Sequence, residues 1–188
     1  DMEIDIEEAK LVQSIIIKNQ NIQSLIGIEY FTNIEILDCS FNNLNQLHIS
    51  DYSKLWFINC SNNNITQLVL FNLPTLHNLA GSFNNLNHLS ISNLPLLYDV
   101  AFGDNPLISL YAKFGFAKSL GPSYFPNSLE YICTDLENIS SWKNTYPQAE
   151  VNSYCSFTPG GNFYSIYGKI NLDLNNNDCK NNPSILHN

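Results

Sequence analysis

The chain has 188 residues, 44% of them hydrophobic, and its 17 acidic residues outnumber its 8 basic residues, giving a formal charge of −9. This length supports one sizeable core and favours one main unit over several domains. All the basic residues are lysines, so the arginine forks and basic face typical of nucleic-acid binders are missing, and we expect no nucleic-acid partner. Acidic charge is repelled by anionic lipid, and no apolar run reaches the roughly 18 residues of a membrane span, so we expect no membrane insertion.

The first residues predict a short helix. Asp5 is followed three residues later by Glu8, ahead of "EEAKLV", and this spacing is typical of a helix capping box. We interpret residues 1–11 as a cap that covers the first apolar residues of the unit that follows.

A repeat of 21 residues dominates the centre of the chain. The stretch "LDCSFNNLNQL" from Leu37 returns as "INCSNNNITQL" from Ile58 and as "LAGSFNNLNHL" from Leu79. Each unit has apolar residues at positions 1, 4, 6 and 11 and asparagine at position 9. A divergent copy begins 22 residues before the first good unit. The units begin at Val12 (divergent), Ile34, Leu55, Leu76 and Leu97. A fixed period in this range indicates stacked structural repeats.

Strand geometry explains the pattern. Alternate side chains of a strand face opposite ways, so positions 4 and 6 point into a coil of chain while positions 3, 5 and 7 point out. Neighbouring coils then bury one another's apolar residues. An asparagine at each turn can satisfy backbone groups inside the coil, which predicts a scaffold ladder of Asn42, Asn63, Asn84 and Asn105. Cys39 and Cys60 occupy an apolar position and are predicted to be buried.

The pattern LxxLxLxxNxL resembles the leucine-rich repeat, over about residues 12 to 115. It is similar in particular to bacterial cell-surface and secreted proteins of the internalin and Bacteroidetes kinds. The resemblance implies an α/β solenoid, a right-handed horseshoe with a parallel sheet on its concave face and a short N-terminal capping helix. It also implies a secreted or cell-surface location and a role in recognition or adhesion. The sequence has no GxSxG, glycine-rich phosphate loop or HExxH motif, so we expect no enzymatic activity. We further expect a monomer and no cofactor, apart from the possible calcium ion considered below.

The repeat decays after Leu110, where a C-terminal cap is expected. Leu129 and Ile132 predict a last strand, and residues 138–151 predict a short helix that ends before Pro147. Trp142 in that helix would cover the core. We therefore assign residues 12–155 to the repeat domain, in which Cys133 and Cys155 either pair in a last coil or remain free.

Residues 156–188 are rich in Gly, Pro and Asn, which marks a boundary. The alternation in "FYSIYGKINLDL" resembles the opening strand of the immunoglobulin-like modules that follow such repeats, so we interpret this segment as a linker and the start of a truncated β-sandwich-like domain. "DLNNNDC" places Asp173, Asn175 and Asn177 at alternate positions, like oxygen ligands of calcium. The alternative is a plain asparagine-rich turn.

The outward positions of the repeat strands are the candidate binding face. Aromatic side chains among small polar and acidic residues are typical of recognition surfaces, and an extracellular protein or a glycan is the expected partner. Trp56, Phe57 and Tyr98 have no periodic structural reason to be exposed, whereas Phe41 shares a repeat position with Phe83 and the two either bind or pack as a spine. The candidate residues are Ile36, Asp38, Phe41, Trp56, Phe57, Asn59, His77, Asn78, Tyr98, Asp99 and Asp104. The competing hypothesis is a structural spacer that binds nothing and displays neighbouring domains.

Overall fold

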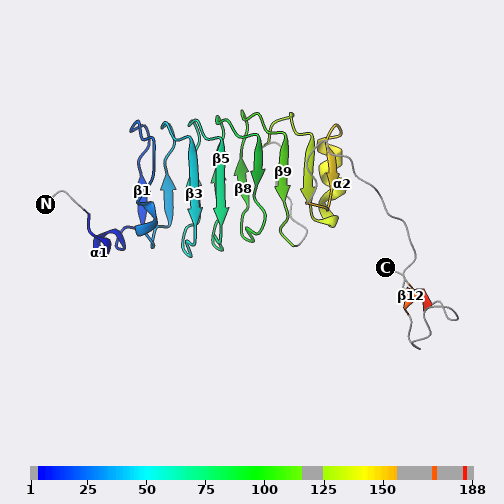
Figure 1. Ribbon diagram of the computed structural model, residues 1–188, viewed down its shortest axis with the longest axis horizontal. Helices are drawn as coiled ribbons and strands as arrows, with labels where there is room; N and C mark the ends of the chain where they lie inside the picture. The colour runs from blue at the N-terminus through cyan, green and yellow to red at the C-terminus, as the bar shows by residue number, and fades with distance from the viewer. Residues whose placement is uncertain (1–3, 116–124, 156–170, 173–183, 186–188) are drawn as a thin grey trace.

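The computed structural model describes residues 4–115, 125–155, 171–172 and 184–185. One side of the coils carries a five-stranded sheet, which we call the front sheet, in the order β1-β2-β4-β6-β8 (Figure 1). All its pairs are parallel, and partners are one repeat apart, as Leu37 opposite Ile58. The strands are β1 (Ser14–Ile16), β2 (Ile36–Asp38), β4 (Phe57–Asn59), β6 (Asn78–Ala80) and β8 (Asp99–Ala101). The predicted leucine-rich-repeat solenoid with a parallel sheet is confirmed.

Each repeat unit also contains a second apolar stretch, such as "LVLFNLPTL" from Leu68 and "LSISNLPLL" from Leu89. These stretches form strands, which make up the other layer of the solenoid. We call this layer the back sheets; β3 pairs with β5, and β7, β9, β10 and β11 form a second group. They are β3 (Gln46–Ser50), β5 (Gln67–Phe71), β7 (His88–Ser90), β9 (Ser109–Ala112), β10 (Tyr131–Thr134) and β11 (Glu150–Asn152). Leu47 and Ile49 of β3 are buried beside Leu37 and Ile58 in one core, so the layers pack face to face. Each fully buried aliphatic side chain contributes about 1.5–3 kcal/mol.

The asparagine ladder joins each coil to the one before it. The Oδ1 atom of Asn63 accepts from the backbone N–H of Leu44 at 2.9 Å, and its Nδ2 donates to the carbonyls of Cys39 and Cys60, each at 3.1 Å. Asn84 and Asn105 repeat this arrangement one and two coils later. These amides therefore satisfy buried backbone groups of two coils at once, and their predicted scaffold role is confirmed.

A glycine and a phenylalanine fit together where Cys39 and Cys60 stand in the earlier coils. Phe102 is fully buried, and a Cβ atom on Gly81 would lie only 2.4 Å from its Cε1 atom. The ring stacks on Phe125 with 6.4 Å between centroids, so it is held from the other side as well. The coil from Leu76 therefore has glycine at this position, and the Phe102 side chain of the next coil fills the space.

A short helix stands at each end of the solenoid (Figure 1). Asp5 and Glu8 form the predicted capping box of α1 (Ile6–Ala9), with the Glu8 N–H donating to Asp5 Oδ1 at 2.8 Å. At the other end, η3 (Leu136–Asn138) leads into α2 (Ile139–Thr145), which buries Trp142 as predicted. The expected last strand is wrong in one respect: Ile132 lies in β10, but β11 follows α2 and pairs parallel with β10.

The C-terminal cap is closed by a disulfide. Cys133 in β10 and Cys155 after β11 are bonded with 5.2 Å between their Cα atoms, which decides between the two alternatives left by the sequence. Further along, β12 (Asn171–Leu172) and β13 (Ser184–Ile185) pair antiparallel. The proposed calcium ligands Asp173, Asn175 and Asn177 lie outside the described residues.

Candidate recognition face

The register of the front sheet arranges the predicted binding residues in rows. One row consists of Ile36, Phe57, Asn78 and Asp99, and the next consists of Asp38, Asn59, Ala80 and Ala101. Each of these side chains points outward because the residue between them in its strand is buried in the core. Along the sheet, the first row therefore changes from apolar to polar side chains, and the second changes from polar side chains to alanine.

Two exposed aromatic residues stand where their strands begin. Trp56 is 40% exposed and Tyr98 is 76% exposed. The Trp56 N–H donates to the Glu35 carbonyl at 3.0 Å and the Tyr98 N–H to the His77 carbonyl at 2.8 Å, so both occupy the same level of the ladder. They are two coils apart, which corresponds to roughly 10 Å at the usual spacing of neighbouring strands. Trp56 also contacts Phe57 edge-on, with 5.8 Å between ring centroids.

A second aromatic pair, Phe41 and Phe83, lies at the opposite end of the front sheet, where the chain leaves β2 and β6 and turns before the asparagine ladder. Phe41, Asn62, Phe83 and Asp104 all have positive φ, between 54° and 57°. Asn and Asp tolerate this left-handed conformation, whereas a bulky side chain rarely adopts it. Phe41 and Phe83 are nevertheless 47% and 56% exposed, so they do not form a buried spine. Lys18 Nζ lies 4.9 Å from the Phe41 ring centroid.

Several of the predicted polar residues are already used by the scaffold. Asp38 Oδ1 accepts from the Ser40 N–H at 3.0 Å, and Asn59 Oδ1 accepts from the Ser61 N–H at 3.1 Å. These bonds end each strand with a local side-chain turn. On the neighbouring strands, Asn78 donates to the exposed Asp99 carboxylate at 3.3 Å, and His77 Nδ1 lies 2.7 Å from the Thr75 carbonyl. The exposed rings of Trp56 and Tyr98 lie outside the buried core.

The described part of the chain offers no group of three or more His, Cys, Asp or Glu side chains placed to hold a metal ion. Cys39 lies beneath the face, where burial, and to a lesser degree the Asp38 charge, raise the pKa of its thiol to about 12. The thiol therefore stays protonated and is a poor nucleophile. What the front face presents is contact area, aromatic rings and hydrogen-bonding groups.

Sequence reasoning missed a hollow on the back layer. It lies against β3 and includes Glu29, His48 and Tyr52, which share no repeat position. The outward residues were predicted from the 21-residue period. The hollow arises where the first coil departs from that period, so the period could not predict it.

No family model matches the sequence, and no curated protein matches it. Among solved structures, the chain is similar to the functional domain of InlJ from Listeria monocytogenes, which is described as including a cysteine ladder. The identity is 20% and the TM-score is 0.49, over 78% of this chain and 40% of that one. The chain thus spans about two fifths of the length of that structure. In the described residues, no helix is long and apolar enough to cross a membrane.

Proposed function

We propose that this chain is an extracellular recognition module that binds a protein or glycan partner on its front face. The observation that carries the proposal is the exposure of four aromatic side chains at the two ends of the front strands. Trp56 and Tyr98 lie at one end, and Phe41 and Phe83 at the other, in a backbone conformation that disfavours phenylalanine. Exposed aromatics that packing does not require are typical anchors of binding surfaces.

The mechanism is recognition by a preformed surface. The outward rows are fixed by parallel pairing below them and by the asparagine ladder beside them, so the partner orders little of this chain when it binds. A ligand that contacts both Trp56 and Tyr98 must span about 10 Å, with His77 between them. Asp99 and Asp104, one at each end of β8, give the coil from Leu97 negative charge, which favours a partner with a basic patch over an acidic one.

The disulfide supports the location. Disulfides persist in oxidising environments such as the cell exterior and are rare in the cytosol. The Cys133–Cys155 bond closes the last described coil, where a solenoid would otherwise expose its core. A secreted or surface-displayed recognition module is the function that these features support together.

The test is binding of the purified chain to a panel of extracellular-matrix proteins and glycans. A Trp56→Ala/Tyr98→Ala variant should lose binding while retaining the thermal midpoint of the parent chain. The matched control is Phe71→Ala, which removes a ring that is 65% exposed on the back strand β5 and should leave binding unchanged. Equal binding by all three chains would move recognition off the front face, and binding by none would favour the spacer hypothesis.

A further inference from the structure

Strand β3 has one edge without a partner strand. It pairs with β5 in a two-stranded sheet, and the Asp51 N–H just after it donates to the Phe71 carbonyl at 3.1 Å. Because alternate residues of a strand direct their N–H groups to opposite edges, Gln46, His48 and Ser50 direct theirs away from β5. In the described residues, these three N–H groups have no backbone or side-chain acceptor.

The irregular first coil is the reason for this free edge. Leu25 stands where a neighbouring strand would run, but Gly27 adopts φ 99° and starts the 3₁₀ turn η1 (Ile28–Tyr30). Two hydrogen bonds still join the first coil to the second, one on each side of the segment that does not pair with β3. The Asn43 N–H donates to the Ile22 carbonyl at 2.8 Å, and the Tyr52 hydroxyl donates to the Ile28 carbonyl at 2.7 Å.

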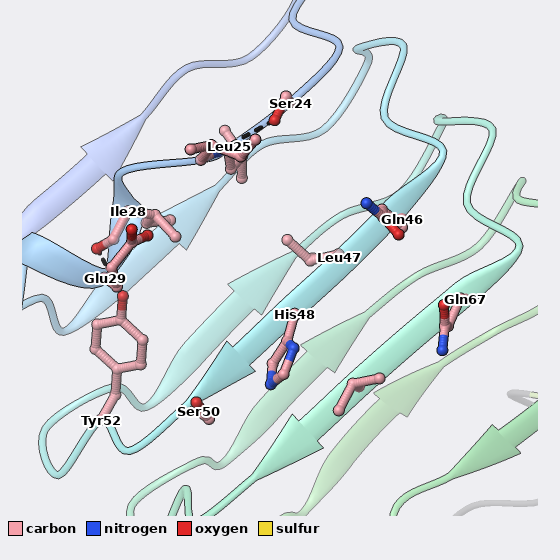
Figure 2. Close-up of a pocket in the computed structure, with 12 residues that line it drawn as sticks. Ser24, Leu25, Ile28, Glu29, Gln46, Leu47, His48, Ser50, Tyr52 and Gln67 are labelled. Atoms are coloured by element: carbon pink, nitrogen blue, oxygen red, sulfur yellow. Dashed lines mark hydrogen bonds between the residues drawn. The ribbon is translucent and has the colours of Figure 1, made fainter.

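Between these two attachments lies a hollow of about 420 Å³. Figure 2 shows Leu25, Ile28 and Glu29 on one side of it and β3 with Gln46 and His48 on the other. A second hollow of about 460 Å³ shares Ser24 and Gln46 with the first, so open space follows the whole free edge. Ile26, which lines the first hollow, is 93% exposed, an unusual state for isoleucine.

We propose that this edge binds an extended peptide segment of a partner protein, which pairs with β3 as an added strand. Donors and acceptors that recur at every second residue match an extended main chain. Leu25, Ile26 and Ile28 supply apolar contact for alternate side chains of the peptide. Glu29 is the only carboxylate among the lining residues and no lysine is present there, so the segment carries Lys or Arg near this end.

A glycan fits the hollow less well. Sugar rings are commonly held by exposed aromatic faces, and the one aromatic residue that lines the hollow, Tyr52, is 4% exposed with its hydroxyl bonded to Ile28. Binding at β3 is independent of the front face, because β3 and β4 belong to separate sheets. The two sites therefore give separate experimental outcomes.

The probe is the synthetic peptide KQLHISK, which copies residues 46–50 between two lysines and thus has the strand preference of β3 itself. Titration into the isotope-labelled full chain should shift the amide signals of Gln46, His48 and Ser50 and slow their hydrogen exchange at least ten-fold at saturation. Two peptides N-methylated on opposite sets of alternate residues form the control. Only one set faces β3 in a paired strand, so one version should bind and the other should bind at least ten-fold more weakly.

Variants of the chain supply the second control. His48→Pro removes one free N–H from an edge where proline is tolerated, and it should weaken binding at least ten-fold. His48→Ala removes the same side chain but keeps the N–H, so it should weaken binding much less than His48→Pro. Glu29→Gln should weaken binding several-fold and reduce its salt dependence. The proposal is overturned if the peptide does not bind at millimolar concentration, if both N-methylated peptides bind equally, or if the shifted amides lie elsewhere. The peptide controls still decide the matter if His48→Pro does not fold.

Discussion

Gly81→Ala tests the packing between two neighbouring coils. The new Cβ would lie 2.4, 2.9 and 3.0 Å from three atoms of the Phe102 ring, whereas real Cβ atoms do not come so close to heavy atoms. The ring cannot move away freely, because it is fully buried and stacked on Phe125. Overpacking of this kind costs about 1–3 kcal/mol.

The backbone effect of the same substitution has the opposite sign. Gly81 does not have a positive φ, so alanine fits its backbone and should stabilise the chain by about 0.4–1 kcal/mol through the unfolded state. The clash is larger, and we expect a net loss of about 1–2 kcal/mol. In a chain of this size this corresponds to a fall of about 2–8 °C in the thermal midpoint.

The assay is thermal and urea unfolding of the parent chain, three single variants and one double variant. Gly103→Ala is the matched control, because the nearest atom to its new Cβ is Ser82 Oγ at 4.0 Å, and it should be neutral or slightly stabilising. Phe102→Leu removes the ring, so Gly81→Ala should cost less in that background than in the parent. If Gly81→Ala is as stable as the parent chain, Phe102 does not fill this space and the proposed fit between the coils is wrong.

Three further predictions concern the buried polar groups and cysteines. Asn84→Ala leaves three buried backbone groups without their partner, and it should lower the free energy of unfolding in urea by about 3 kcal/mol or more. The control Asn85→Ala changes an exposed neighbour and should lower it by under about 0.5 kcal/mol. Equal effects of the two substitutions would contradict the scaffold role of the ladder. Replacing Cys133 and Cys155 by serine opens a loop with a sequence separation of 22 and should cost about 3 kcal/mol by calorimetry, and an unchanged midpoint would show that the bond adds nothing. Burial raises the pKa of the Cys39 thiol from 9.0 to about 12. The protonated thiol therefore contributes fully to the free energy of unfolding below pH 9, and this contribution is lost as the pH rises toward 12. A thiol reagent at pH 8 should modify Cys39 only as fast as the chain unfolds, and rapid modification of the native chain would refute its burial.

The front sheet and its ladder were predictable because they repeat. A period of 21 residues fixes which residue lies opposite which, so Leu37, Ile58 and Leu79 align and Asn42 and Asn63 stack without any further information. The capping box at Asp5 was predictable for a similar reason: it is a local pattern whose partners are three residues apart.

Features that depend on unlike neighbours were not predictable. In the sequence, Gly81 occupies an apolar repeat position without an evident reason, and the reason is the Phe102 ring that packs against it in the structure. Asp38 and Asn59 were predicted to face a ligand, but part of each side chain caps its own turn, a choice that depends on the exact path of the chain after the strand. The free edge of β3 arises because the first coil departs from the repeat at Gly27, where the pattern carries no signal.

The direction of the asparagine bonds has a consequence for how the chain is made. Each ladder amide reaches back to the coil before it, as Asn63 does to Leu44, so a coil's buried N–H finds its acceptor only in the coil that follows. On the ribosome, where the N-terminal end emerges first, a coil cannot be completed until about one more repeat has left the exit tunnel. We therefore expect ordered structure in the solenoid to trail the growing end by one coil, so that the disulfide-bonded coil orders after the coils before it.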